Sequence, residues 1–178
     1  MPRCLARDLQ FSRLLYTWRI ASALAVMQLS EHFSLDQLAY SETALQRGID
    51  NMPPPESVEN LRRLAYGLEQ VQALLEYPIS ISSGYRCPAL NTAVGGSPGS
   101  QHVWGLAADF TCEAFGPPLA VAQAIGASVI EFDQCILEFG RWVHISFSTK
   151  PRGRLLTIHD TAQGYLDGLW DREGNRLA

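Results

Sequence analysis

The strongest structural pattern in this sequence of 178 residues is a long amphipathic segment that follows three consecutive prolines at positions 53–55. Its apolar residues recur every three or four positions, as on one face of an α-helix. These residues are Val58, Leu61, Leu64, Ala65, Leu68, Val71 and Leu75. Proline is common in the first turn of a helix, and Tyr77 followed by Pro78 predicts the end of this one. The sequence therefore predicts one long helix with an apolar face.

Shorter strand-like and helix-like segments follow this helix. Residues 78–84 alternate isoleucine with serine, as a half-buried strand does, and residues 102–112 also indicate a strand. Residues 116–129 form a second predicted helix with prolines near its start. Two apolar and aromatic segments flank Gly140 and predict a β-hairpin, and a last strand is expected around residues 155–159. This order predicts an α+β fold, a single compact domain with a small antiparallel sheet flanked by helices.

Composition limits the partners of this domain. Apolar residues make up 47% of the sequence and charged residues only 18%, which is enough to build a core. The net charge of -4, without a clustered basic face, argues against a nucleic-acid binder. No stretch approaches the roughly 18 apolar residues that a membrane helix needs. We therefore expect a soluble protein that does not span a membrane and does not bind nucleic acid. We also expect it to be a monomer.

The two ends of the chain are predicted to lie outside the domain, which we assign to residues 27–160. Residues 161–178 are expected to form a C-terminal tail and residues 1–26 an N-terminal extension. The extension has basic residues before an apolar run, as a secretion signal does, but Arg19 interrupts that run. It is thus no convincing signal, and a loosely attached helix is the alternative. The four cysteines form no CxxC pair, so we expect unpaired thiols, and one disulfide in an oxidising compartment is the alternative.

A metal site is predicted around the segment SQHVWGLAADF, in which His102 and Asp109 stand seven residues apart. An imidazole and a carboxylate are ordinary zinc ligands, and His144 on a later strand would be the third. Three protein ligands leave a fourth position for water, as in catalytic zinc sites. Asp109 lies in an apolar run, where a carboxylate is costly unless it is paired or metal-bound. The alternative is a buried ion pair between Asp109 and Arg86, with His102 merely exposed in a loop.

The position of one further carboxylate depends on the turn of the predicted hairpin. With a turn of three residues, 139–141, Glu138 would pair with Trp142 and share a face of the sheet with His144. With a turn of two residues, Glu138 would lie on the face opposite His144. The sequence leaves both turns open.

At these residues the chain resembles the zinc D-alanyl-D-alanine carboxypeptidase family, cell-wall peptidases that include dipeptidases and phage lysins that cut peptidoglycan stem peptides. The family pattern is Ser, any residue, His, two residues, Gly, any residue, Ala, any residue, Asp. The positions that match this pattern and the family's later Trp and His are Ser100, His102, Gly105, Ala107, Asp109, Trp142 and His144. The resemblance covers roughly residues 29–147.

The resemblance implies one zinc ion, held by His102, Asp109 and His144. It also implies that Arg86 grips a substrate carboxylate or helps to order the site, a role that suits a guanidinium because it can donate two hydrogen bonds to a carboxylate. Ser100 and Gln101 are further candidates for hydrogen bonds to the substrate, although capping and loop-closing roles also fit them.

The general base is less directly implied. Several relatives place the catalytic carboxylate three residues before the last histidine, where this sequence has Arg141, which cannot accept a proton. We predict that Glu138, six residues before His144, is the base, as in the version of the pattern with a longer hairpin turn. Glu131 and Asp133, at the start of the same hairpin, are the alternatives.

The expected function is zinc-dependent hydrolysis of peptide bonds in peptidoglycan stem peptides or cross-links, by a carboxypeptidase or an endopeptidase that acts on the cell wall. Two alternatives stay open. One is a zinc-stabilised module that binds wall peptides without cutting them, and the other is a soluble D,D-dipeptidase. The sequence assigns neither the bond that is cleaved nor a compartment.

Overall fold

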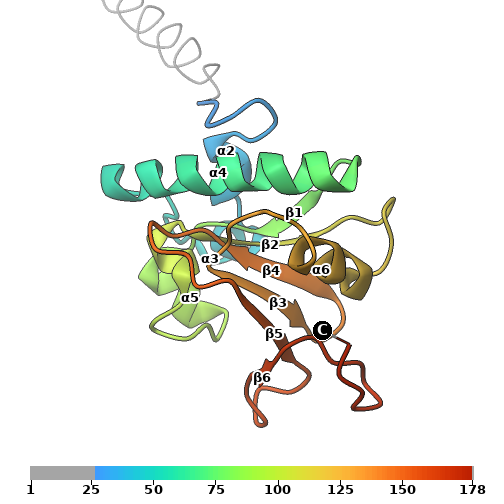
Figure 1. Ribbon diagram of the computed structural model, residues 1–178. Coiled ribbons are helices and arrows are strands. Elements are labelled where there is room, and N and C mark those ends of the chain that lie inside the picture. The colour runs from blue at the N-terminus through green and yellow to red at the C-terminus, as the bar shows by residue number, and fades with distance from the viewer. Residues whose placement is uncertain (1–26, 178) are drawn as a thin grey trace, which may run out of the picture.

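The computed structural model describes residues 27–177, so the expected N-terminal extension lies outside the described residues. Five helices, one short 3-10 helix and six strands make up this part of the chain (Figure 1). In order they are α2 (Leu35–Ala39), α3 (Glu42–Arg47), α4 (Pro55–Leu75), β1 (Ser80–Ser83), α5 (Pro88–Ala93), η1 (Gln101–Trp104), β2 (Ala107–Thr111), α6 (Pro118–Gly126), β3 (Gln134–Glu138), β4 (Trp142–Ser146), β5 (Arg154–Ile158) and β6 (Leu166–Asp167). Among the described residues, no helix is long and apolar enough to cross a membrane.

The strands form one sheet in the order β1-β2-β4-β3-β5-β6. All neighbouring pairs are antiparallel except β3 and β5, which are parallel. The predicted α+β domain is confirmed, but its sheet is mixed where we expected it to be antiparallel. The parallel pair follows from the chain path after β4. Strand β4 ends beside the start of β3, and the connection from there to β5 is short. Because β5 begins there and occupies the free edge of β3, it must run in the direction of β3.

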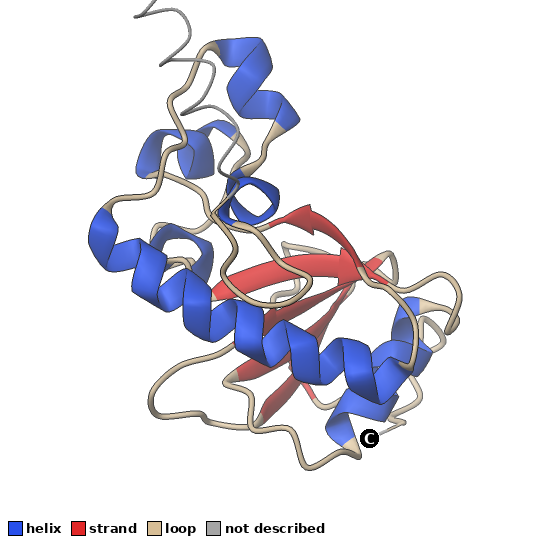
Figure 2. Ribbon diagram, turned by 90° about the horizontal axis from the view of Figure 1, so that it is seen from above, coloured by secondary structure: helices blue, strands red, loops and turns tan. Residues whose placement is uncertain are grey.

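Helix α4 is the long amphipathic helix that the sequence predicts. Proline occupies its first turn, and it ends at Glu76, whose φ of 60° is left-handed. The apolar residues from Leu61 to Leu75 on its inner face are fully buried. Together with α6 it covers one face of the sheet, as Figure 2 shows in the view from above. Gly67 lies so close to the ring of Phe147 that a Cβ atom would overlap it, so α4 and the chain after β4 pack in direct contact.

The two faces of the sheet differ in chemistry because successive side chains of a strand point to opposite sides. On the helix-covered side, Phe110 from β2, Val143 and Ile145 from β4 and Leu137 from β3 belong to the main core. On the other side, Asp109 lies opposite His144 in the ladder. The sheet therefore supports the main apolar core on one face. The other, here called the polar face, carries Asp109 and His144 beside a smaller buried apolar cluster of Ile136, Leu156 and Ile158.

Several short elements were not predicted. The segment expected as a loop, residues 87–100, contains α5, and the expected tail contains β6 and the fully buried Leu169, which joins the main core. Cys87, Cys112 and Cys135 are free thiols in the described part of the chain, as expected. The boundary at residue 160 stays a prediction.

Candidate metal centre

Three elements bring the predicted metal ligands together. His102 lies on η1, which ends at Gly105 with a left-handed φ of 71°. A Cβ atom at Gly105 would stand 3.0 Å from both Leu61 Cγ and the Ser57 carbonyl oxygen of α4, so a glycine is required for the turn and for this close approach. Asp109 lies on β2, directly opposite His144 on β4. The chain thus places two ligands on adjacent strands and the third on the turn that enters the first of these strands.

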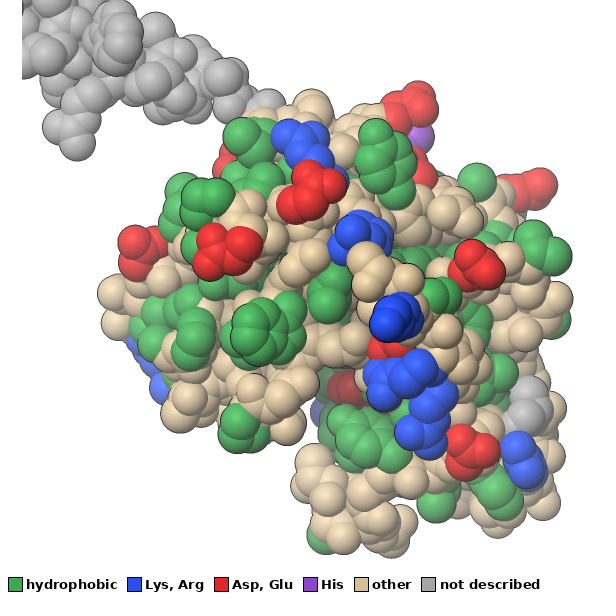
Figure 3. Space-filling model, turned by 60° about the vertical axis from the view of Figure 1, so that its left-hand side comes forward, with side chains coloured by type: hydrophobic (Ala, Val, Ile, Leu, Met, Phe, Trp, Pro, Cys, Tyr) green, Lys and Arg blue, Asp and Glu red, His purple; other side chains and the backbone are tan. Residues whose placement is uncertain are grey.

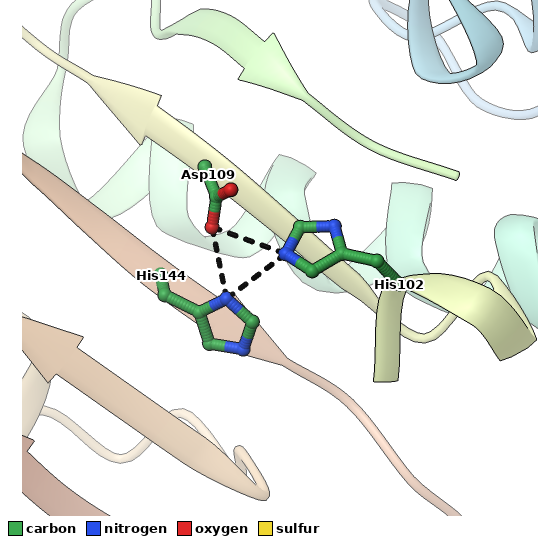
Figure 4. Close-up of side chains that lie close together, drawn as sticks. All are labelled: His102, Asp109 and His144. Carbon is green, nitrogen blue, oxygen red and sulfur yellow. Dashed lines mark hydrogen bonds and ion pairs between the residues drawn. The ribbon is translucent and has the colours of Figure 1, made fainter. Parts of the chain in front are cut away.

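The three side chains converge on one point (Figure 4). Nε2 of His102 lies 3.2 Å from Oδ1 of Asp109 and 3.1 Å from Nδ1 of His144, and Nδ1 of His144 lies 2.9 Å from Oδ1 of Asp109. All three residues are buried, with His102 only 1% exposed. His102 is therefore not the exposed loop residue that the alternative interpretation required.

A hydrogen bond to the backbone determines which ring nitrogen of His102 carries the proton. Its Nδ1 lies 2.6 Å from the carbonyl oxygen of Gly84, which can only accept, so Nδ1 carries the proton and donates it. Burial lowers the pKa of His102, which favours the neutral ring. In the neutral ring with a protonated Nδ1, Nε2 has a lone pair and no proton. That lone pair points toward Asp109 and His144.

Asp109 is ionised in this arrangement. Burial alone would raise the pKa of its carboxyl, but interactions with His102 and His144 outweigh burial and hold the pKa far below the usual range. An ionised oxygen and the lone pair of His102 Nε2 lie 3.2 Å apart, and two such groups repel each other unless a proton or a cation lies between them. The donor set therefore favours a bound cation.

The geometry of the donor atoms fits zinc. Zinc bonds of about 2.0 to 2.1 Å at tetrahedral angles place neighbouring ligand atoms about 3.3 to 3.4 Å apart. The three observed separations, 2.9 to 3.2 Å, are a few tenths of an ångström shorter. Two imidazole nitrogens and one carboxylate oxygen are also ordinary zinc donors. His102, Asp109 and His144 could together occupy one face of a zinc tetrahedron.

Arg86 forms the ion pair that the alternative interpretation expected, but it does so beside the cluster. Its Nη2 lies 3.3 Å from Oδ2 of Asp109, the carboxylate oxygen that does not face the histidines. The ion pair and the histidine cluster thus use different oxygens of the same carboxylate. The Nε–H of Arg86 is buried and has no acceptor among the described residues, so the guanidinium keeps a donor free.

The hairpin has the three-residue turn. Glu138 pairs with Trp142, and Phe139 adopts a left-handed φ of 55° although it is not glycine. Glu138 and His144 therefore share the polar face of the sheet. The Trp142 Nε1–H donates to Oε2 of Glu138 at 3.1 Å. Burial raises the pKa of Glu138, and the charges of His144, Asp109 and Arg86 also act on it, so the carboxyl lies near the metal ligands.

The other predicted site residues have different surroundings. The side-chain amide of Gln101 donates to Oδ2 of Asp133 at 2.9 Å, so its NH2 group already has a protein partner. Asp133, an alternative base, is buried and forms an ion pair with Arg152, which lowers its pKa. Glu131, the other alternative, is exposed. Ser100 precedes η1 and makes no side-chain cap.

Sequence reasoning missed two contributors to this region. The carbonyl of Gly84 orients His102, and no side-chain motif can signal a backbone acceptor. Tyr165, in the segment expected as a tail, lies close enough to Glu138 and Asp109 for their charges to raise its pKa, after the larger effect of burial. In the sequence, Tyr165 is recognisable only as an aromatic residue that follows a glycine, which does not indicate a place near the site.

On the face drawn in Figure 3, several Lys and Arg side chains gather right of the centre with acidic side chains beside them, and further acidic side chains are scattered over the rest. This distribution agrees with the net charge of -4. Apolar side chains lie between the charged ones on the same face.

Comparison with known proteins agrees with the site geometry. The sequence model of the Peptidase M15 family matches residues 31–146, well over half of the chain. The match begins before α2 and ends with β4, and it includes the three clustered residues, Glu138 and Arg86. A search of curated proteins finds no match. The M15 family consists of zinc-dependent peptidases, and the His-Asp-His cluster of this chain could bind such a metal. The chain belongs to the Peptidase M15 family, the zinc D-alanyl-D-alanine carboxypeptidase-like peptidases that its sequence resembles.

Proposed function

We propose that this protein is a zinc peptidase that hydrolyses peptide bonds in the stem peptides or cross-links of bacterial peptidoglycan. The observation that carries the proposal is the convergence of three buried donor atoms at zinc-like separations, with the half-buried carboxylate of Glu138 on the same face of the sheet. Membership of the Peptidase M15 family supports both the metal and the class of substrate. In this proposal His102, Asp109 and His144 hold one zinc ion.

Zinc, when bound, supplies a Lewis acid that polarises the scissile carbonyl and lowers the pKa of water. Glu138 acts as the general base in the proposed reaction. Its carboxylate accepts a proton from the attacking water and passes it to the nitrogen of the leaving amine. Burial raises its pKa, which makes the carboxylate a stronger base for the first of these transfers. The Trp142 indole holds Oε2 of Glu138, so the other oxygen is available for the proton.

Arg86 has two proposed tasks. Through Nη2 it holds Oδ2 of Asp109, which leaves Oδ1 directed at the histidines. Its free Nε–H can serve a carboxylate of the substrate, since a buried donor without an acceptor costs about 1 to 3 kcal/mol. Gln101 contributes indirectly, because its amide is bound to Asp133, and Ser100 keeps its hydroxyl for the substrate.

The proposal is tested by incubating the zinc-loaded protein with purified peptidoglycan and identifying the released fragments by mass spectrometry. We expect fragments that lose a terminal D-alanine or that are cut within the stem or cross-link. Glu138→Gln should release almost none, whereas Glu131→Gln, which changes the exposed acid of the same hairpin, should match the wild type.

Each other outcome has a defined meaning. No release by a folded, zinc-loaded protein that still binds peptidoglycan would contradict the peptidase and favour the binding module. Cleavage of soluble D-alanyl-D-alanine, with peptidoglycan left intact, would favour the dipeptidase. A fully active Glu138→Gln variant would remove Glu138 from the mechanism.

A further inference from the structure

The register of the sheet places Tyr165 in line with the proposed base. Glu138 of β3 lies opposite Trp142 of β4 on one side and opposite Ile158 of β5 on the other. β5 pairs with β6 through Thr157 and Leu166, so continuing this antiparallel register by one residue brings Tyr165 opposite Ile158. Residues that lie opposite each other across a ladder share a face. Trp142, Glu138, Ile158 and Tyr165 therefore form one row on the polar face of the sheet.

From this row we infer that Tyr165 completes the substrate cleft and that its hydroxyl donates a hydrogen bond to a carbonyl oxygen of the bound peptide. Trp142 and Tyr165 flank Glu138 from opposite sides. Tyr165 lies two strand spacings from Glu138, or about 10 Å between the backbones, with Ile158 between them in the row. The inference rests on the proposed peptidase function and adds to it a substrate-binding residue.

The state of the phenol suits a hydrogen-bond donor. The side chain of Tyr165 is 59% exposed, so a substrate can reach it. Burial of part of the ring and the charges of Glu138 and Asp109 raise the pKa of the hydroxyl, so it keeps its proton at neutral pH.

The backbone just after Tyr165 is anchored to β5 and to the main core. Gly168, just after β6, donates through its N–H to the carbonyl of Leu155 at 2.8 Å and accepts from Thr157 Oγ1 at 3.0 Å. Leu169 follows and is fully buried in the main core. Tyr165 thus projects from a segment that is fixed to β5. Figure 1 shows this segment beside β5 at the edge of the sheet.

Tyr165 also lies beyond the part of the chain that the family shares. The match to Peptidase M15 ends at residue 146, before β5 and β6 begin. Tyr165 is therefore not part of the matched segment that contains the three candidate metal ligands. In this protein the C-terminal segment brings it to the site, so it would adapt the common site to the particular peptide that this chain cuts.

The test uses Tyr165→Phe, which removes the hydroxyl and keeps the ring. Tyr66→Phe is the matched control, because Tyr66 is 63% exposed on α4, the helix that covers the other face of the sheet. With a soluble stem pentapeptide that ends in D-alanyl-D-alanine, we expect Tyr165→Phe to lower kcat/KM roughly tenfold, the effect of one lost hydrogen bond, and Tyr66→Phe to leave it unchanged.

A binding measurement separates this inference from the peptidase proposal. In the zinc-loaded Glu138→Gln background, calorimetry with the same pentapeptide should show a Kd raised roughly tenfold by Tyr165→Phe. Equal affinities with and without the hydroxyl would overturn the inference and leave the peptidase proposal standing. Tight binding that depends on Tyr165, without cleavage by the wild type, would overturn the peptidase proposal alone. No binding by either protein would overturn both.

Discussion

At the scale of single residues, Asp109 is the residue that contacts both histidines of the cluster and Arg86. A carboxylate in an apolar strand needs partners, and the sequence offered either an ion pair with Arg86 or a metal. The structure shows that the two are compatible, because Arg86 takes Oδ2 while Oδ1 faces the histidines. Such a contact behind a ligand orients it and tunes its charge. The ion pair is therefore part of the candidate metal centre and not an alternative to it.

The identities of the clustered residues were predictable, but their orientation was not. The spacing of His102 and Asp109 and the later His144 are visible in the sequence. The proton on Nδ1 of His102 depends on the Gly84 carbonyl, and the placement of the Gln101 amide depends on Asp133, which lies directly before β3. Both are long-range contacts that a local pattern cannot encode.

The raised pKa of Glu138 predicts a pH dependence of the reaction. A general base must be deprotonated, so kcat/KM should fall as the pH drops through the pKa of Glu138. Because burial raises this pKa, the fall should begin at a higher pH than an exposed glutamate would give. The measurement is kcat/KM against pH for the zinc-loaded wild type. An acid limb that persists unchanged in the residual activity of Glu138→Gln would assign the titration to another group.

At the scale of elements, the hairpin turn decides which face carries Glu138. The sequence allowed turns of two or three residues, and contacts from outside the hairpin accompany the longer one. The N–H of Phe139 donates to the carbonyl of Ile158 on β5, and Arg172 donates to the carbonyl of Phe139. Both partners lie after the hairpin in the chain. The turn was thus unpredictable from the hairpin sequence alone.

Asp133 connects the element that carries His102 to the sheet. Its carboxylate accepts hydrogen bonds from Gln101 at the start of η1 and from Arg152 before β5, and it lies directly before β3. Asp133→Asn removes the negative charge that pairs with Arg152 and replaces one of the two accepting oxygens with an NH2 group, so we expect a loss of about 1 to 3 kcal/mol of unfolding free energy. We also expect weaker zinc binding, because η1 becomes less fixed. Urea unfolding and competition with a chelator measure the two effects.

The control for this variant is Asp167→Asn. Asp167 also forms an ion pair with an arginine, Arg154, but the pair is exposed and should contribute less than about 1 kcal/mol. Equal, small effects of the two substitutions would show that Asp133 does not hold η1 in place. A loss of stability in Asp133→Asn with unchanged zinc affinity would restrict its role to the fold.

At the scale of the whole molecule, the C-terminal segment belongs to the same core as α4. We expected residues 161–178 to form a tail, because glycines and mixed charges there gave no clear period. Leu169 is nevertheless fully buried with residues of the main core, and β6 extends the sheet. One buried leucine in a polar stretch is too short a pattern to detect. By contrast, the helical periodicity over the whole length of α4 was sufficient to predict this helix, and the two apolar segments around Gly140 were sufficient to predict the hairpin of β3 and β4.

Leu169→Ala tests whether this segment folds with the rest of the domain. Removing a fully buried leucine side chain should lower the unfolding free energy by about 2 to 5 kcal/mol in a single cooperative transition. Leu166→Ala, at a residue that is 36% exposed, should have a much smaller effect. Thermal unfolding followed by circular dichroism gives both values. Similar small losses for the two variants would mean that the segment is not part of the cooperative unit.

The central claim is that His102, Asp109 and His144 together bind zinc, and the most direct test is the zinc content of the purified protein. Inductively coupled plasma mass spectrometry should find about one zinc per chain in the wild type, as three protein ligands imply. Alanine at any of the three positions should abolish the bound zinc, while His32→Ala, which changes an exposed histidine paired with Glu69, should retain it. Wild-type protein that binds no zinc, or an Asp109→Ala variant that keeps its full zinc content, would contradict the claim.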